Sequence, residues 1–179
     1  MLKNKKYLLF LLITFLMCLL SVIFHELGHA IIYKIQGFNI DFNLTQANPV
    51  SGELTLLGSM GGFLTNLIFA LIFLLLFRKY KNILLFSVVF AHTWFARIFI
   101  YLLKLPRGYL PADEKFIADY LNIAPLLLCL LILIVFSLIL YQAVKIIFEK
   151  YSKSNSLKIL IYSFIASLLA MFVIIPLEG

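Results

Sequence analysis

The amino-acid sequence predicts an all-α polytopic membrane protein with about five transmembrane helices and a small β-hairpin at the membrane surface. Hydrophobic residues make up 64% of its 179 residues, charged residues only 13%, and the mean hydropathy is +1.07. Soluble domains do not have this balance. The charged residues lie in short groups between apolar runs that are long enough to cross a bilayer. We therefore expect one membrane-embedded domain over residues 1–179.

The first span follows Lys3, Lys5 and Lys6 and begins with an uncharged run from Tyr7 to Phe24. Basic residues before an apolar run are also typical of secretory signals, but no small-residue cleavage site follows this one. We therefore expect a retained helix. It should continue through the sequence HELGHAIIYKI toward Gly37, because glycine commonly follows the last residue of a helix.

Residues 38–45 alternate between apolar and polar side chains, which predicts a strand with one apolar face. Asn48-Pro49 then indicates a turn, and Ser51–Leu56 is expected to return as a second short strand. Such a hairpin has an edge that can bind an extended peptide through its backbone. The alternative interpretation is a partly ordered connecting loop.

Further spans are expected at about Leu56–Phe77, Ile83–Leu103, Ile123–Ile147 and Leu157–Pro176. With the N-terminus in the cytoplasm, ten Lys and Arg residues are cytoplasmic and four are outside, so the positive-inside rule favours this orientation. The ten are Lys3, Lys5, Lys6, Arg78, Lys79, Lys81, Lys145, Lys150, Lys153 and Lys158, and the four are Lys34, Lys104, Arg107 and Lys115. This spread of the +7 net charge indicates membrane orientation and no nucleic-acid surface.

Two spans contain polar residues at informative positions. Gly58, Gly62, Asn66 and Ala70 recur every four residues and form a small-residue stripe, against which a neighbouring helix can pack closely. Asn66 either ties helices together or hydrogen-bonds a substrate carbonyl or oxyanion. His92 and Arg97 in the third span are interpreted as interhelical hydrogen-bond partners.

The HELGH segment carries the chemistry of the first span. Positions i and i+4 share a helix face, so His25 and His29 can bind one metal ion, while Glu26 lies about 100° round, beside them. Two histidines and one carboxylate are a typical catalytic zinc set that leaves a position for water, and Glu26 can act as its general base. Three ionisable groups directly after 18 uncharged residues are costly in lipid, which indicates a use.

The third metal ligand must come from another segment, and Asp113 is our choice. The chain around Pro106, Gly108 and Pro111 has turn residues that can fold it back and direct this carboxylate toward the metal. The alternative is that Asp113 is the N-cap of a helix starting at Glu114. Glu114 is then the nearest substitute ligand, and His92 is a further one.

These segments resemble the site-2 protease family of intramembrane metalloproteases. The likeness covers about residues 7–120 and rests on FHELGHA at 24–30, GGFLTN at 61–66 and LPRGYLPAD at 105–113, in the family's order. The resemblance implies that Asp113 completes a zinc site and that an unwound substrate lies on a membrane-associated sheet. Gly62 replaces the family's proline and Glu114 its glycine. The lysine distribution also puts the site toward the outside, whereas the family generally places its metal toward the cytosol.

We therefore expect a zinc protease that hydrolyses peptide bonds of membrane proteins or peptides within the lipid bilayer. Residues 121–179 add two helices without a motif. The rival hypothesis is a non-catalytic protein, either a degenerate protease that binds membrane segments or a metal-handling subunit. The presence of Glu26 argues against the first, and the scarcity of polar residues in the last two spans argues against the second.

Overall fold

A computed structural model describes residues 2–44 and 46–174 of the chain. Thr45 in the predicted strand and Pro176 at the predicted end of the last span lie outside these residues. Within them, five helices are long and apolar enough to cross a membrane. They span Lys5–Ile35, Leu56–Tyr80, Ile83–Arg107, Pro125–Lys150 and Lys153–Ile174. The predicted fold class is confirmed.

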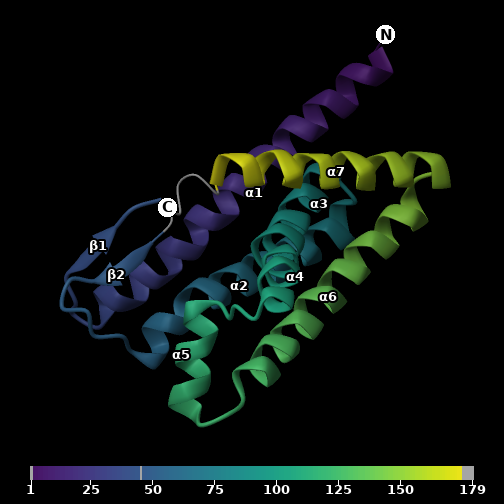
Figure 1. The fold of residues 1–179 in the computed structure, drawn as a ribbon. Helices are drawn as coiled ribbons and strands as arrows, with labels where there is room; N and C mark the ends of the chain where they lie inside the picture. Colours follow the sequence, from purple (N-terminus) through teal and green to yellow (C-terminus); the bar gives the residue numbers. More distant parts are fainter. Residues whose placement is uncertain (1, 45, 175–179) are drawn as a thin grey trace.

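The third span is the central helix of the bundle. It consists of α3 (Ile83–Phe90), the π-helix η1 (Ala91–Phe99), α4 (Ile100–Lys104) and the 3₁₀ helix η2 (Leu105–Arg107), which run on without a break. In its most apolar stretch of 18 residues, 61% of the residues are buried, whereas the share in the other four spans is between 22% and 33%. Figure 1 shows it between α1 (Leu2–Ile35) and α2 (Leu56–Tyr80) on one side and α6 (Pro125–Lys150) on the other. Polar side chains on this span are therefore surrounded mainly by protein instead of lipid.

The close contact between α1 and α2 depends on small residues. The predicted stripe of Gly58, Gly62, Asn66 and Ala70 is buried throughout. A side chain at Gly61 would overlap the backbone of Gly28 and His29 on α1, so the two helices approach to backbone contact at this level. α2 begins after Thr55, whose hydroxyl accepts a hydrogen bond from the backbone N–H of Gly58.

The predicted hairpin forms, but with different boundaries. β1 (Ile40–Phe42) pairs antiparallel with β2 (Ala47–Pro49), so Asn48-Pro49 lies in a strand and Ser51–Leu56 forms none. Asn48-Pro49 is therefore not the turn between the two strands, but a turn does follow it, since the carbonyl of Pro49 accepts a hydrogen bond from the N–H of Gly52. The missing N–H of Pro49 costs no hydrogen bond between the strands, because the next residue, Val50, donates to the carbonyl of Asn39.

Helix α5 (Ala112–Leu121) is a short amphipathic segment between the third and fourth spans. The chain before it turns at Gly108, which has a φ of 75° in the left-handed region that favours glycine. Pro111 then precedes the first helical residue, so Asp113 lies inside the first turn and is not the N-cap. This fold-back, which the turn residues predicted, brings α5 against α2 and α6.

Most basic residues of the chain lie at one end of the bundle. The N-terminal part of α1 meets the turn between α6 and α7 (Lys153–Ile174), where the Tyr7 hydroxyl donates to Asn155 at 3.0 Å. The Lys150 ammonium donates to the carbonyl of Lys81 in the α2–α3 turn. The hairpin and α5 lie at the other end of the helices (Figure 1).

Candidate metal centre

The structure brings together the three residues that the sequence predicted as metal ligands. His25 and His29 lie one turn apart on α1, and Asp113 comes from the first turn of α5. The Nε2 atoms of the two histidines are 3.2 Å apart, and the Oδ2 atom of Asp113 is 3.1 Å from Nε2 of His29 and 3.4 Å from Nε2 of His25. Among the described residues this is the one group of three or more such side chains that can hold a metal ion.

The donor set fits zinc. Ligands bound at about 2.0–2.1 Å in tetrahedral geometry are separated by about 3.3 Å, which is close to all three observed distances. The other ring nitrogen of His29, Nδ1, donates to the backbone carbonyl of Gly58 at 2.7 Å. This bond leaves the lone pair of a neutral imidazole on Nε2, where a metal would need it. The three ligand atoms therefore face a common point.

Asp113 has the charge that a metal ligand requires. Burial alone would raise the pKa of its carboxyl group, but hydrogen bonds from His25 and His29 outweigh this, so the pKa lies below its ordinary value. Its side chain is 32% exposed, whereas that of His29 is 5% exposed. The carboxylate thus reaches the site from its more open side.

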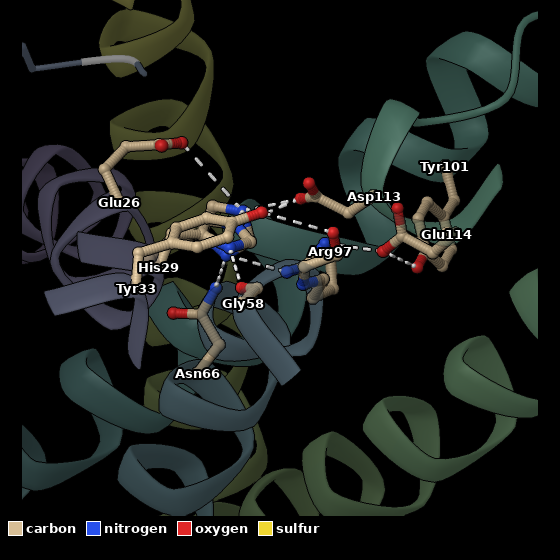
Figure 2. Close-up of polar contacts among 11 residues, drawn as sticks. Glu26, His29, Tyr33, Gly58, Asn66, Arg97, Tyr101, Asp113 and Glu114 are labelled. Atoms are coloured by element: carbon tan, nitrogen blue, oxygen red, sulfur yellow. Dashed lines mark hydrogen bonds and ion pairs between the residues drawn. The ribbon is translucent and has the colours of Figure 1, made fainter. Parts of the chain in front are cut away.

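Glu26 lies beside the ligand group without belonging to it. Its Oε1 atom is 3.9 Å from Nε2 of His25, and its side chain is 12% exposed (Figure 2). The backbone N–H of Ala47 on β2 donates to this carboxylate. Glu26 is therefore within reach of a molecule bound at the centre, as a general base must be.

The two substitute ligands point elsewhere. Glu114 is completely buried, and its Oε1 atom accepts hydrogen bonds from Arg97 at 2.8 Å and from the Tyr101 hydroxyl at 2.6 Å. Nδ1 of His92 donates to the Oδ1 atom of Asn66 at 2.7 Å, and the ring of His92 stacks on Phe69. The predicted interhelical role of His92 and Arg97 agrees with this geometry.

The contacts of Nδ1 of His25, the ring nitrogen that does not face Asp113, were not predicted from the sequence. Nη2 of Arg97 donates to Nδ1 of His25 at 2.7 Å, and Nδ2 of Asn66 approaches the same atom at 3.5 Å. Because a guanidinium group only donates, Nδ1 of His25 accepts this hydrogen bond, and a neutral imidazole in this arrangement carries its proton on Nε2. His25 can therefore bind a metal through Nε2 only if the proton moves to Nδ1 and the contact with Arg97 changes. The signal in the sequence was the position of Arg97, a permanent charge inside an apolar span.

The π-helix explains how His92 and Arg97 come to lie on the same side of the third span. In an α-helix, residues five apart differ by about 140° in direction. A π-helix, hydrogen-bonded from i to i+5 with about 4.4 residues per turn, places them near one face. η1 contains both residues, so its local geometry directs them together toward α1 and α2.

Gly62 is where α2 comes closest to the ligands. A Cβ atom at this position would overlap Cε1 and Nδ1 of His25 and Nε2 of His29. The two imidazole rings thus lie directly on the backbone of α2, and only glycine leaves room for them.

The ligand group opens into a cavity of about 450 Å³. Its lining includes the carboxylates of Glu26 and Asp113, together with Gln46 and the β2 residues Ala47 and Asn48. It also includes apolar side chains, among them Phe95, Phe99 and Leu103 from the third span and Met171 from α7. Among the described residues the sheet has two strands, so one edge of β2 has no strand partner. The centre can therefore receive an extended chain from the hairpin side.

Comparisons with known proteins give no relative from which a function can be transferred. No family model matches the chain, and neither the curated proteins nor the solved structures include a significant match.

Proposed function

We propose that this chain is an intramembrane zinc metalloprotease that hydrolyses peptide bonds of membrane proteins or peptides. The observation that carries the proposal is the tetrahedral spacing of His25, His29 and Asp113 next to a carboxylate that is not a ligand. Its position within five apolar helices separates this site from that of a soluble zinc protease. Zinc bound there supplies the Lewis acidity that makes water a nucleophile near neutral pH and polarises a substrate carbonyl.

Glu26 accepts the proton of the attacking water and returns it to the leaving amine. Its distance from the ligand group suits this role, because it lies near the reacting atoms but leaves the three ligands to hold the metal. The hydrogen bond from the backbone of Ala47 orients its carboxylate. Proton transfer by such a group typically contributes about 10²–10⁴-fold to the rate.

The substrate binds as an extended strand beside β2. The carbonyl of Gln46 and the N–H of Val50 both bond to the β1 side of the hairpin, so the intervening Ala47 and Pro49 direct their backbone groups to the other edge. On that edge the N–H of Ala47 bonds to Glu26 and the carbonyl of Pro49 accepts from Gly52, so the carbonyl of Ala47 is the group proposed to pair with the substrate. Residues of β2 line the cavity. A helical substrate must unwind before it can pair there, because a helix has already used its amide groups in internal hydrogen bonds.

The basic end of the bundle is the cytoplasmic one, so the N-terminus is cytoplasmic and the metal centre lies toward the opposite side. The lysine-rich N-terminus lies at the same end of the bundle as the two lysine-rich turns, between α2 and α3 and between α6 and α7. This common position supports the orientation. The location proposed for this multi-pass protein is the cell membrane.

The test is the variant Glu26→Gln, purified and reconstituted into liposomes with a library of single-span model peptides. We expect it to keep one zinc per chain and to lose cleavage by about 10²–10⁴-fold, as detected by mass spectrometry of the products. His25→Ala and Asp113→Ala should lose the metal as well as the activity, because each removes one of three ligands.

Glu53→Gln is the matched control, since Glu53 lies in the connection between hairpin and α2 and is not part of the ligand group. It should cleave as the wild type does. Wild-type cleavage by Glu26→Gln contradicts the mechanism, and stoichiometric zinc in Asp113→Ala contradicts the ligand set. A wild-type protein that binds zinc and cleaves no peptide would support the non-catalytic alternative.

A further inference from the structure

The cavity at the metal centre is lined both by membrane spans and by parts of the chain outside them. Val22, Phe95 and Met171 line it from three of the five spans. Asn48 of the hairpin and Pro111 before α5 also line it, and both lie outside the spans. A peptide that fills this cavity therefore contacts the apolar surroundings of a membrane segment and the polar surroundings just beyond it.

The charged residues of the cavity lining are not all compensated. Four charged side chains line the cavity, namely Glu26, Asp113, Arg97 and Lys104. The two carboxylates lie at the metal centre, where a zinc ion would balance their charge, and Arg97 is 2.8 Å from Glu114. Lys104 is exposed and forms no ion pair with any residue that the structure describes. The lining thus presents one positive charge without a partner in the protein.

The position of Lys104 on α4 directs it to the cavity. Ile100 and Lys104 are one helical turn apart, and both line the cavity. This face of the third span is therefore apolar and ends in an ammonium group. The other basic residues predicted at this end of the bundle, Lys34, Arg107 and Lys115, are also exposed but do not belong to the cavity lining.

We propose that the cavity takes the junction between an apolar segment and an acidic residue next to it, and that Lys104 binds the carboxylate of this residue. This inference rests on the proposed function, because it names the substrate class of the same site. The substrates are membrane-associated peptides that carry Asp or Glu at the boundary of their apolar segment.

A lysine suits this task better than a buried, fixed group would. Its flexible stem lies along apolar surface while the ammonium group stays in polar surroundings, so it can follow a carboxylate at the boundary. Attraction between opposite charges is also stronger beside a low-dielectric region than in bulk water. An amide or a basic side chain at the same place in the substrate gains no such attraction.

The experiment uses three single-span model peptides that differ only in carrying Asp, Asn or Lys at both boundaries of the apolar segment. They compete for the purified protein in detergent micelles, and mass spectrometry of the products gives the ratios of kcat/KM. We expect the wild type to prefer the Asp peptide over the Asn peptide by about 2–5-fold, as for one exposed ion pair. Fluorescent forms of the peptides should bind Glu26→Gln in the same order, which measures selection without cleavage.

Substitutions of Lys104 separate recognition from stability. Lys104→Met should remove the preference for Asp, and Lys104→Glu should reverse it, so that the Lys peptide becomes the best substrate. Because Lys104 is exposed and unpaired among the described residues, both variants should melt at nearly the wild-type temperature. Lys34→Met is the matched control, since it removes a lysine that does not line the cavity, and it should keep the preference.

Equal cleavage of the Asp and Asn peptides by the wild type overturns the inference. An unchanged preference in Lys104→Met overturns it too, and so does an equal loss in Lys34→Met, which would assign the preference to overall charge. If the wild type cleaves none of the peptides, the proposed reaction fails, and the binding order on Glu26→Gln decides about Lys104. Equal or absent binding of the three peptides there overturns the inference.

Discussion

Gly62→Ala tests how closely the metal centre depends on the contact between α1 and α2. The added methyl group would overlap atoms of both histidine ligands. Carbon atoms in contact prefer separations of about 3.5–4.0 Å, so the imidazoles must recede from α2 by about 1 Å or more. Zinc sites tolerate changes of only about 0.2 Å in ligand distance. The displacement therefore exceeds the tolerance of the site several-fold.

The effect on stability should be small by comparison. Replacing glycine by alanine inside a helix gains about 1 kcal/mol from backbone propensity, whereas overpacking costs about 1–3 kcal/mol. We expect a net destabilisation of about 0–2 kcal/mol together with a loss of zinc affinity of about 10-fold or more. Metal affinity is measured by chelator competition, and folding by circular dichroism and thermal unfolding in detergent.

The variant Gly61→Ala distinguishes two causes of a loss of zinc affinity: crowding of the imidazole ligands, and a larger distance between α1 and α2. Its Cβ atom would meet the backbone of Gly28 and His29 and no imidazole atom. We expect Gly61→Ala to be the more destabilised variant, because backbone cannot move aside as a ring can. A Gly62→Ala protein with wild-type zinc affinity refutes the reasoning. Equal loss of zinc in both variants would attribute the effect to the distance between the helices.

Two further predictions follow from the same contacts. Asn66→Ala leaves the buried Nδ1 of His92 without its acceptor, so unfolding should become easier by about 1–3 kcal/mol. Its zinc affinity should stay close to that of the wild type, because its own contact with His25 is long; a fall of about 10-fold or more would make Asn66 a support of that ligand. Chelation of the metal should lower the melting temperature of the wild type and not that of Asp113→Ala. Zinc at 100 times its dissociation constant contributes about 2.7 kcal/mol to stability, and equal responses of the two proteins would contradict metal binding at this site.

Features that depend on composition and local spacing could be predicted from the sequence. Hydropathy identified the five spans, since an apolar run of this length has few alternatives to crossing a membrane. The i, i+4 spacing placed His25 and His29 on one face, and the turn residues before α5 indicated that the chain folds back with Asp113.

The features that could not be predicted depend on contacts between distant segments. Nothing in the sequence distinguished the π-helix from an α-helix, in which residues five apart differ by about 140° in direction, so the shared direction of His92 and Arg97 was not visible. The pairing of Glu114 with Arg97 was also not visible, because the two residues lie in different segments of the chain. The turn signal of Asn48-Pro49 was misleading because it is local, whereas the end of a strand is decided by its partner strand.

The separation of the ligands along the chain has a consequence for biosynthesis. His29 and Asp113 are 84 residues apart, and the central span lies between them. While the chain is being synthesised and inserted, the histidine pair enters the membrane long before its carboxylate partner is made. A two-histidine site binds zinc more weakly than a completed three-ligand site. Metal capture is therefore expected only after three helices have been inserted and α5 has folded back, so that incomplete chains remain inactive.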